Sequence, residues 1–297
     1  MTFIPHLHVG SGTQLESLTV FPIWVDGAGT PGLDWGRTHL DVSERAGSAS
    51  VPELVVRNTG AAPLPILDGD LFVGGQQNRM AASAMLLDPE QSAVMPVRCV
   101  EQGRWSGSAR HEASSLRASH SVRYGRHLGT SRLADQGEVW DRVQRFEQTF
   151  GATVSSDLVT HLDRARTPAA HPAKQIRPID GQRGVMFGIA GRIVACEIFG
   201  SARGLRSRWR GIVDAAVLDA AHMSPVATPS FKARAFAARM ASVPRRDERR
   251  TPRIRTIAAA DERTAITTDW VTDAEGRRRG LMHATAYNRT HAVLQRA

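Results

Sequence analysis

The sequence contains few cysteines, few lysines and no long apolar run. Of its 297 residues only two are cysteines, Cys99 and Cys196, and one pair in so large a chain indicates reduced thiols rather than a disulfide framework. No stretch approaches the roughly eighteen consecutive apolar residues of a transmembrane helix. The N-terminal residues show neither a basic leader nor an apolar signal core. We therefore expect a soluble, cytoplasmic protein with no membrane partner.

Positive charge is present but unevenly distributed. The formal net charge is +9, yet residues 1–223 carry 23 basic against 22 acidic residues, while residues 224–297 carry 15 against 7. Nearly every basic residue is arginine, since the only lysines are Lys174 and Lys232. Basicity confined to the last quarter is a weak sign of a nucleic-acid footprint, which normally covers a face of the domain. The overall charge therefore does not by itself indicate an RNA ligand, and only specific residues can.

Short apolar runs separated by turn residues predict a β-rich antiparallel sheet. Five such runs fall between residues 51 and 101, too close together for crossover helices. Later apolar residues at helical spacing predict a helical hairpin insertion and one long packing helix. We predict one α+β domain over residues 1–297, with a β-meander at 18–105, a basic loop at 106–133, a helical hairpin at 134–165, a hairpin plus helix at 184–221, an exposed charged linker at 244–256 and a terminal hairpin at 264–288.

Two polar segments interrupt the predicted meander. The first begins at the double glycine Gly74-Gly75, and the second follows the strand that ends near residue 101. Glycine and asparagine are depleted in strands, and buried amides need several hydrogen-bond partners. We therefore expect the two segments to meet in one ligand site, made of Asp70, Gln76, Gln77, Asn78, Arg79, Glu101, Arg104 and Trp105.

The residue types in this predicted site suit a nucleotide-like ligand. Glu101 is the candidate general base or metal ligand, with Asp70 as a second candidate catalytic carboxylate. Arg79 and Arg104 are candidate phosphate clamps, because a guanidinium donates paired hydrogen bonds to phosphate oxygens. The indole of Trp105 offers a stacking surface for a base.

A purely structural role fits the same residues. The double glycine would form a β-bulge, the amides would satisfy loop carbonyls, and Arg79 with Glu101 would be a buried ion pair that fixes strand register. The two interpretations predict different geometries. An enzyme should place Glu101, Arg79 and Arg104 around one concave pocket, whereas a structural module should bury them in satisfied pairs.

Three further features favour structural roles over chemistry. Cys99 has no histidine near it in the sequence, so a small core residue is favoured over a nucleophile. Asp68 and Asp70 indicate a hairpin turn more than a Mg²⁺ site. His6 and His8 lie near the N-terminus, where we do not expect a metal. We predict no metal site, and no cofactor is indicated.

The order and spacing of these motifs resemble one protein family. They are similar to the ARG and rhodanese-phosphatase-superfamily-associated protein domains of the first ARPP type, over about residues 18–287. The resemblance implies a β-rich bacterial domain associated with nucleotide, RNA-repair and ADP-ribose-linked systems. The chain departs from the family pattern at Asp70, where glutamate is expected, and at Gly75, where a larger residue is usual. The motifs that carry the resemblance are Gly69-x-Leu71, Gly74-x-Gln76-Gln77-Asn78-Arg79, Pro96-Val97-x-Cys99-Val100-Glu101-x-Gly103-Arg104-Trp105, Gln136-x-x-Val139-Trp140, the segment 184–199 and Leu281-Met282-His283.

Residues and resemblance together lead to one expected function and one alternative. We expect an enzyme-like or sensing domain that binds or acts on a nucleotide, ADP-ribose or RNA-end phosphate. The alternative is a non-catalytic interaction module whose polar motifs stabilise a bulged β-sheet. Neither reading indicates an oligomeric state.

Overall fold

The computed structural model describes residues 3–45, 52–125, 132–166 and 176–295. The chain forms two compact units, where the sequence pattern led us to expect one domain. Unit 1 comprises Met1–Pro31, Lys174–Trp209 and Ala220–Ala297, and unit 2 comprises Gly32–Ala173 and Arg210–Asp219. Unit 2 is therefore inserted into the sequence of unit 1. The helix α4 (Ala202–Ala220) contributes residues to both units.

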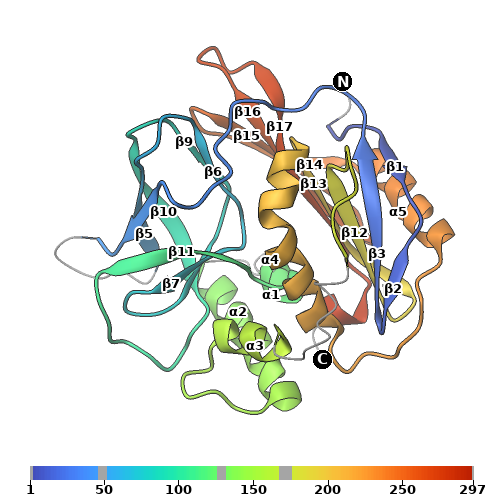
Figure 1. Cartoon of the computed structure of the whole chain (residues 1–297), viewed down its shortest axis with the longest axis horizontal. Coiled ribbons are helices and arrows are strands. Elements are labelled where there is room, and N and C mark those ends of the chain that lie inside the picture. The colour runs from blue at the N-terminus through green and yellow to red at the C-terminus, as the bar shows by residue number, and fades with distance from the viewer. Residues whose placement is uncertain (1–2, 46–51, 126–131, 167–175, 296–297) are drawn as a thin grey trace. The chain divides into compact units, whose positions relative to one another are not determined.

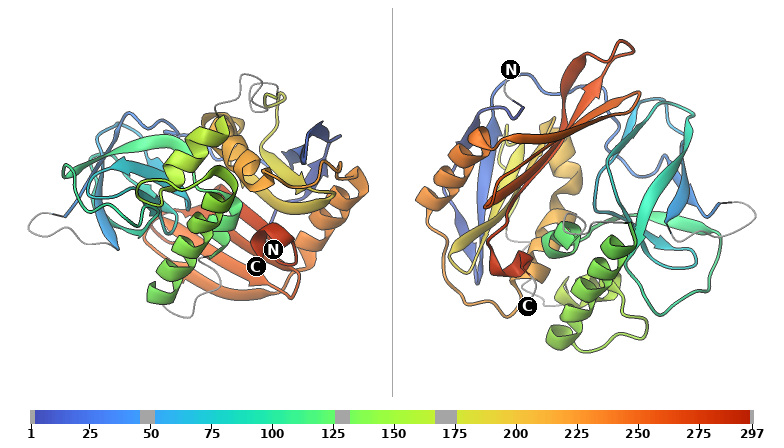
Figure 2. Two further views of the ribbon diagram at one scale, coloured as in Figure 1. Left: turned by 90° about the horizontal axis from the view of Figure 1, so that it is seen from below. Right: turned by 180° about the vertical axis from the view of Figure 1, so that it is seen from behind.

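Unit 1 is built on a nine-stranded antiparallel sheet. The order of its strands is β1-β3-β12-β13-β17-β16-β15-β14, with β2 also paired to β3. The orange to red strands β14 to β17 can be followed as one twisted surface in Figure 2. The strands are β1 (Leu7–Val9), β2 (Thr13–Leu15), β3 (Leu18–Val25), β12 (Gly184–Ile189), β13 (Arg192–Phe199), β14 (Arg245–Arg250), β15 (Ile254–Ala260), β16 (Thr264–Thr272) and β17 (Arg278–Asn288).

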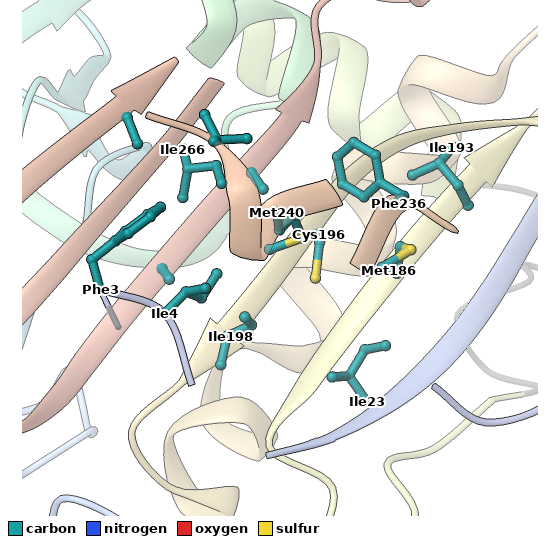
Figure 3. Close-up of a cluster of buried hydrophobic side chains, with 14 of the residues drawn as sticks. Phe3, Ile4, Ile23, Met186, Ile193, Cys196, Ile198, Phe236, Met240 and Ile266 are labelled. Atoms are coloured by element: carbon teal, nitrogen blue, oxygen red, sulfur yellow. The ribbon is translucent and has the colours of Figure 1, made fainter. Parts of the chain in front are cut away.

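One face of this sheet is covered by the helix α5 (Ser230–Ser242). Its apolar side chains Phe236 and Met240 pack against Ile193, Cys196 and Ile198 of β13, as Figure 3 shows. The last quarter of the chain therefore supplies part of the core despite its charge. A short 3-10 helix, η2 (Ala292–Leu294), follows the final strand.

The charged segment 244–256 is not the linker that its composition predicts. Residues Arg245–Arg250 form the edge strand β14, which pairs with β15 and has every residue exposed. Charged side chains are common on edge strands because they discourage pairing with other chains. The prediction of exposure is met over residues 244–252 but not at Ile254, which is buried in β15, and the prediction of an irregular linker is wrong.

Unit 2 contains a closed barrel with the strand order β10-β5-β4-β11-β7-β8 (Figure 1). Its interior is apolar along most of its length, with residues such as Leu54, Phe72 and Val97. The predicted basic loop at 106–133 contains one of the barrel strands and a short helix, α1 (His120–Gly125), while residues 126–131 lie outside the described residues. The barrel strands are β4 (Leu40–Ser43), β5 (Glu53–Asn58), β7 (Asp70–Gly74), β8 (Arg79–Ala81), β10 (Ser92–Cys99) and β11 (Arg110–Arg117), and β6 (Leu64–Ile66) pairs separately with β9 (Met85–Leu87).

Two longer helices complete unit 2. These are α2 (Arg132–Phe150) and α3 (Leu158–Arg166), over the range in which we expected a helical hairpin. Val139, Val143 and Leu162 belong to a buried apolar cluster of this unit. The fold as a whole is α+β with a β-rich antiparallel core, which confirms the predicted class. Among the described residues no helix is both long and apolar enough to cross a membrane.

Candidate ligand-binding site

One end of the barrel carries a layer of buried polar side chains. Side chains two residues apart on a strand point to the same face. The strands β4, β8, β10 and β11 each place one apolar residue inside the barrel, and these are Val42, Ala81, Val97 and Ala113. Two positions away from each of them, toward the same end of the barrel, stands a residue with a polar or sulfur-containing side chain. We call these four residues the polar layer: Glu44, Arg79, Cys99 and His111.

Arg79 is the cation of the polar layer. It is fully buried, and its Nη1 donates a 2.8 Å hydrogen bond to Oε1 of Gln77. Its Nε and Nη2 atoms have no hydrogen-bond partner among the described residues. Burial lowers the pKa of Arg79, although the nearby Cys99 and Glu44 act in the opposite direction. The half-exposed indole of Trp105 lies over the guanidinium, with its centroid 5.6 Å from the guanidinium carbon.

Cys99 is a buried neutral thiol beside Arg79. Its Sγ lies 2.8 Å from the carbonyl oxygen of Glu101 and 3.2 Å from Oε1 of Gln77, which are the two possible acceptors for its single S–H. Burial raises the pKa of the Cys99 thiol, and this effect exceeds the lowering by the backbone hydrogen bond at Glu101 and by the charge of Arg79. A neutral thiol is a poor nucleophile. The geometry agrees with the expectation that Cys99 is a core residue.

Glu44 and His111 form the other side of the polar layer. A 3.0 Å hydrogen bond joins His111 Nε2 to Glu44 Oε1, while Glu44 Oε2 has no hydrogen-bond partner in the described part of the chain. Burial lowers the pKa of His111 despite the neighbouring carboxylate. Gly75 must lack a side chain here, because its φ is +55° and a Cβ would lie 2.0 Å from His111 Nε2. Gly75 therefore allows the backbone to approach a buried imidazole closely.

Glu101 has no free lone pair. Its carboxylate accepts four hydrogen bonds, two from Arg104 at 2.8 and 2.6 Å, one from the Asn78 backbone N–H at 2.8 Å and one from Ser155 Oγ at 2.7 Å. Burial raises the pKa of Glu101, but these hydrogen bonds lower it by more, and the net shift is downward. A carboxylate offers about four acceptor sites. Glu101 is therefore engaged as the structural partner of Arg104, which disfavours a role as general base or metal ligand.

Arg104 uses all of its donors within the protein. Besides Glu101, it donates to the backbone carbonyls of Gly75 at 2.7 Å, Ser106 at 2.8 Å and Gly74 at 3.3 Å. A guanidinium has five N–H groups, and the hydrogen bonds of Arg104 account for each of them. Arg104 thus fastens the loop after β10 to the end of β7. The predicted phosphate clamp at this position is already occupied.

The predicted amide side chains hold loops together. Gln76 Nε2 donates to a loop carbonyl at 3.1 Å, and Gln77 Nε2 donates to the carbonyl of Glu101 at 2.8 Å. Asn78 Nδ2 donates to Asp157 at 2.9 Å, and the same carboxylate accepts backbone N–H groups in the first turn of α3. These contacts match the structural interpretation, in which the amides satisfy loop groups.

Asp70 does not join the other predicted residues. It begins β7, whereas the polar layer lies at the end where that strand finishes at Gly74. Four residues at about 3.3 Å per residue separate the two ends by about 13 Å. Asp70 is fully buried, 2.8 Å from Arg37 Nη2 and 3.5 Å from Arg117 Nη1, and accepts a hydrogen bond from the Leu67 N–H. It is part of a separate structural ion cluster.

A groove of about 780 Å³ lies over strands of the barrel, but the predicted site residues do not line it. His111 of the polar layer contributes to its wall, and Arg79, Glu101, Arg104 and Trp105 do not. The groove is lined by Arg37, Thr38, Leu40, Asp41, Val42, Ser43, Val55, Arg57, Val73, Ser92, Arg110, His111, Glu112 and Ala113.

The structure therefore brings together most of the predicted residues and adds two that the sequence did not indicate. Glu44 and His111 were missed, since each has its hydrogen-bond partner far away in the sequence, whereas Cys99 is the core residue that was expected. One pattern in the sequence could have indicated Glu44 and His111. Each lies two residues from an apolar core residue of the same strand region, and residues two apart on a strand point to the same face.

Comparison with known families agrees with the motif order described above. The model of the family described as ARPP-1, the ARG and Rhodanese-Phosphatase-superfamily-associated Protein domain, matches residues 6–287. The chain belongs to this family. The ARPP-1 match runs through both units, so the family domain comprises the sheet of unit 1 as well as the barrel of unit 2. No curated protein matches the chain significantly.

Proposed function

We propose that the polar layer binds a phosphate-bearing, nucleotide-like ligand, and that the domain is a binding or sensing module. Ligands of this class include a nucleotide, ADP-ribose or an RNA-end phosphate. In this proposal Arg79 holds the phosphate and Trp105 stacks on the base. Glu101 and Arg104 form the scaffold rather than the catalytic machinery.

The contrast between the two arginines carries the proposal. Arg104 donates through Nε, Nη1 and Nη2, whereas Arg79 has unused Nε and Nη2 atoms while fully buried. Buried polar groups are nearly always hydrogen-bonded, and each exception calls for an explanation such as a water or a ligand. Two adjacent N–H donors on a guanidinium match two oxygens of a phosphate. An anion at this point would complete the bonding of Arg79.

Trp105 supports the nucleotide part of the proposal. One face of its indole lies over Arg79, and about half of the residue is exposed to solvent. An aromatic ring beside an arginine is a common platform for a base, worth about 1–3 kcal/mol per stacked base. The side chain would have to turn outward to admit a phosphate. Its position in the irregular stretch between β10 and β11 leaves it free of strand pairing.

The alternative is the structural module, and one observation favours it. The four hydrogen bonds to Glu101 support a role for part of the predicted site in holding loops in place. If Arg79 has the same role, the domain should bind no nucleotide. The two proposals therefore differ in the behaviour of Arg79.

Calorimetric titration of the full chain with AMP and ADP-ribose tests the proposal. We expect binding by the wild type, a loss of about 100-fold in affinity for Arg79→Met because two charge-assisted hydrogen bonds disappear, and a loss of about 10-fold for Trp105→Ala. Phe231→Ala, which removes another exposed aromatic side chain, is the matched control and should bind like the wild type. Absence of binding by the wild type, or equal binding by Arg79→Met, would leave the structural module as the explanation.

A further inference from the structure

A cluster of two histidines and one aspartate lies on unit 1, remote in sequence from the polar layer. The edge strand β1 pairs with β3, and Leu7 and Val9 of β1 pack against the apolar core of the unit. Because side chains alternate along a strand, His6 and His8 point to the opposite face. Their side chains are 71% and 55% exposed, which leaves them accessible to a solute.

Strand pairing brings Asp26 to the two histidines. The register joins Leu7 to Val25, and the Asp26 N–H donates to the His6 carbonyl at 3.1 Å, which places Asp26 directly opposite His6. Directly opposite residues in an antiparallel pair share a face. The aspartate therefore lies on the same exposed face as both imidazoles.

The three side chains already approach the geometry of a metal site. His8 Nε2 lies 2.7 Å from Asp26 Oδ1, and His6 Nδ1 lies 3.3 Å from Asp26 Oδ2. One atom from each residue can be chosen so that all three lie within 4.8 Å of one another. Tetrahedral zinc with bonds of about 2.0–2.1 Å needs ligand atoms about 3.3 Å apart. Small rotations of exposed side chains reach that spacing without moving the backbone.

We propose that His6, His8 and Asp26 form a binding site for a first-row divalent metal of the zinc class. Two imidazole nitrogens and one carboxylate oxygen suit Zn²⁺, and also Co²⁺, Ni²⁺ and Cu²⁺. Ca²⁺ and Mg²⁺ prefer ligand sets made of oxygen and are excluded from this site. Three protein ligands leave at least one position for water. A bound ion would fasten the edge strand β1 to the end of β3.

The sequence alone did not favour this site because the third ligand is remote. Asp26 stands 18 positions after His8, and nothing in the local pattern joins them. The pairing of β1 with β3 supplies the connection. The inference is independent of the nucleotide site, since all three residues belong to unit 1.

Titration of the metal-free full chain with ZnCl₂ tests the proposal. We expect one zinc ion per chain with a dissociation constant on the order of micromolar, a rise in melting temperature on binding, and visible absorption from tetrahedral Co²⁺ when that ion is substituted. His8→Asn and Asp26→Asn should each weaken zinc binding by at least tenfold. Their melting temperatures without metal should match the wild type, because the side chains are exposed.

His39→Asn is the matched control. His39 is another exposed histidine that contacts a single carboxylate, with 2.9 Å between its Nδ1 and Asp34 Oδ2. This variant should bind zinc like the wild type. The proposal is overturned if the wild type binds no zinc, or if His8→Asn and Asp26→Asn bind it as tightly as the wild type does.

Discussion

Replacing Arg79 and Arg104 by methionine, one at a time, should change stability by very different amounts although both arginines lie in the same site. Within the described residues the Arg79 guanidinium donates a hydrogen bond only to the neutral side-chain amide of Gln77, so its removal deprives no carboxylate of a hydrogen-bonded cation. Arg104 donates two hydrogen bonds to Glu101. Its removal leaves the buried Glu101 carboxylate with two uncharged donors, the Asn78 backbone N–H and the Ser155 hydroxyl. The unfolding free energies should therefore diverge.

The expected magnitudes follow from these contacts. Arg79→Met loses one charge-assisted hydrogen bond, about 1.5–3 kcal/mol, and a cation–π contact of about 0.5–1 kcal/mol. Relief from burying a guanidinium offsets this by several kcal/mol. The net change should stay within about 1 kcal/mol of zero. Arg104→Met should cost about 2–3 kcal/mol, slightly below the usual cost of breaking a buried pair, because the Arg104 side chain is 28% exposed.

Urea unfolding followed by tryptophan fluorescence measures both changes. Equal slopes against urea for the variants and the wild type would show that only stability has changed. A loss of about 3 kcal/mol or more for Arg79→Met would refute the reasoning, since Arg79 would then be half of a structural pair. An Arg104→Met variant as stable as the wild type would refute the assignment of Glu101 and Arg104 as the scaffold.

Two other predictions concern Glu101 and the last quarter of the chain. The pKa of Glu101 is held below its ordinary value of 4.5, so its stabilising effect is complete above that pH and disappears as the pH falls through the lower folded pKa. The difference in unfolding free energy between the wild type and Glu101→Gln should therefore shrink from pH 7 to about pH 3, and a constant difference would contradict the assignment. Truncation after Ala221 removes β14 to β17 and α5, which supply much of the core of unit 1, so the truncated chain should melt at a lower temperature or lose solubility, and unchanged melting would show that the tail is an appendage.

The elements that could be predicted from the sequence are those with a recognisable pattern in their own residues. The hairpin of β12 and β13 and that of β16 and β17 are apolar segments joined by short turns, and α4 has apolar residues at helical spacing. The strand β14 was missed because its six residues are all charged and contain no apolar alternation. Its strand conformation depends on pairing with β15, which no local pattern encodes.

Only those parts of the candidate site that lie on neighbouring strands could be predicted from the sequence. Gln77, Arg79 and Glu101 come together because β8 and β10 are neighbours in the barrel. The length of β7 carries Asp70 away from them, and barrel closure brings in His111, which is 67 positions from Glu44. Closure depends on strand tilt and register summed around the barrel. The sequence shows which strands exist but not how they close.

The insertion of unit 2 into unit 1 has a consequence for folding during synthesis. Ile23 of β3 pairs with Gly184 of β12, and about 160 residues are made between the two. At roughly 5–20 residues per second the ribosome needs about 8 to 30 s for that interval. The barrel strands, from Leu40 to Arg117, are contiguous and emerge well before β12 does. The nascent chain therefore carries β3, a mostly apolar strand, without its β12 neighbour while the barrel has time to close, and this strand is the segment that a chaperone would need to shield.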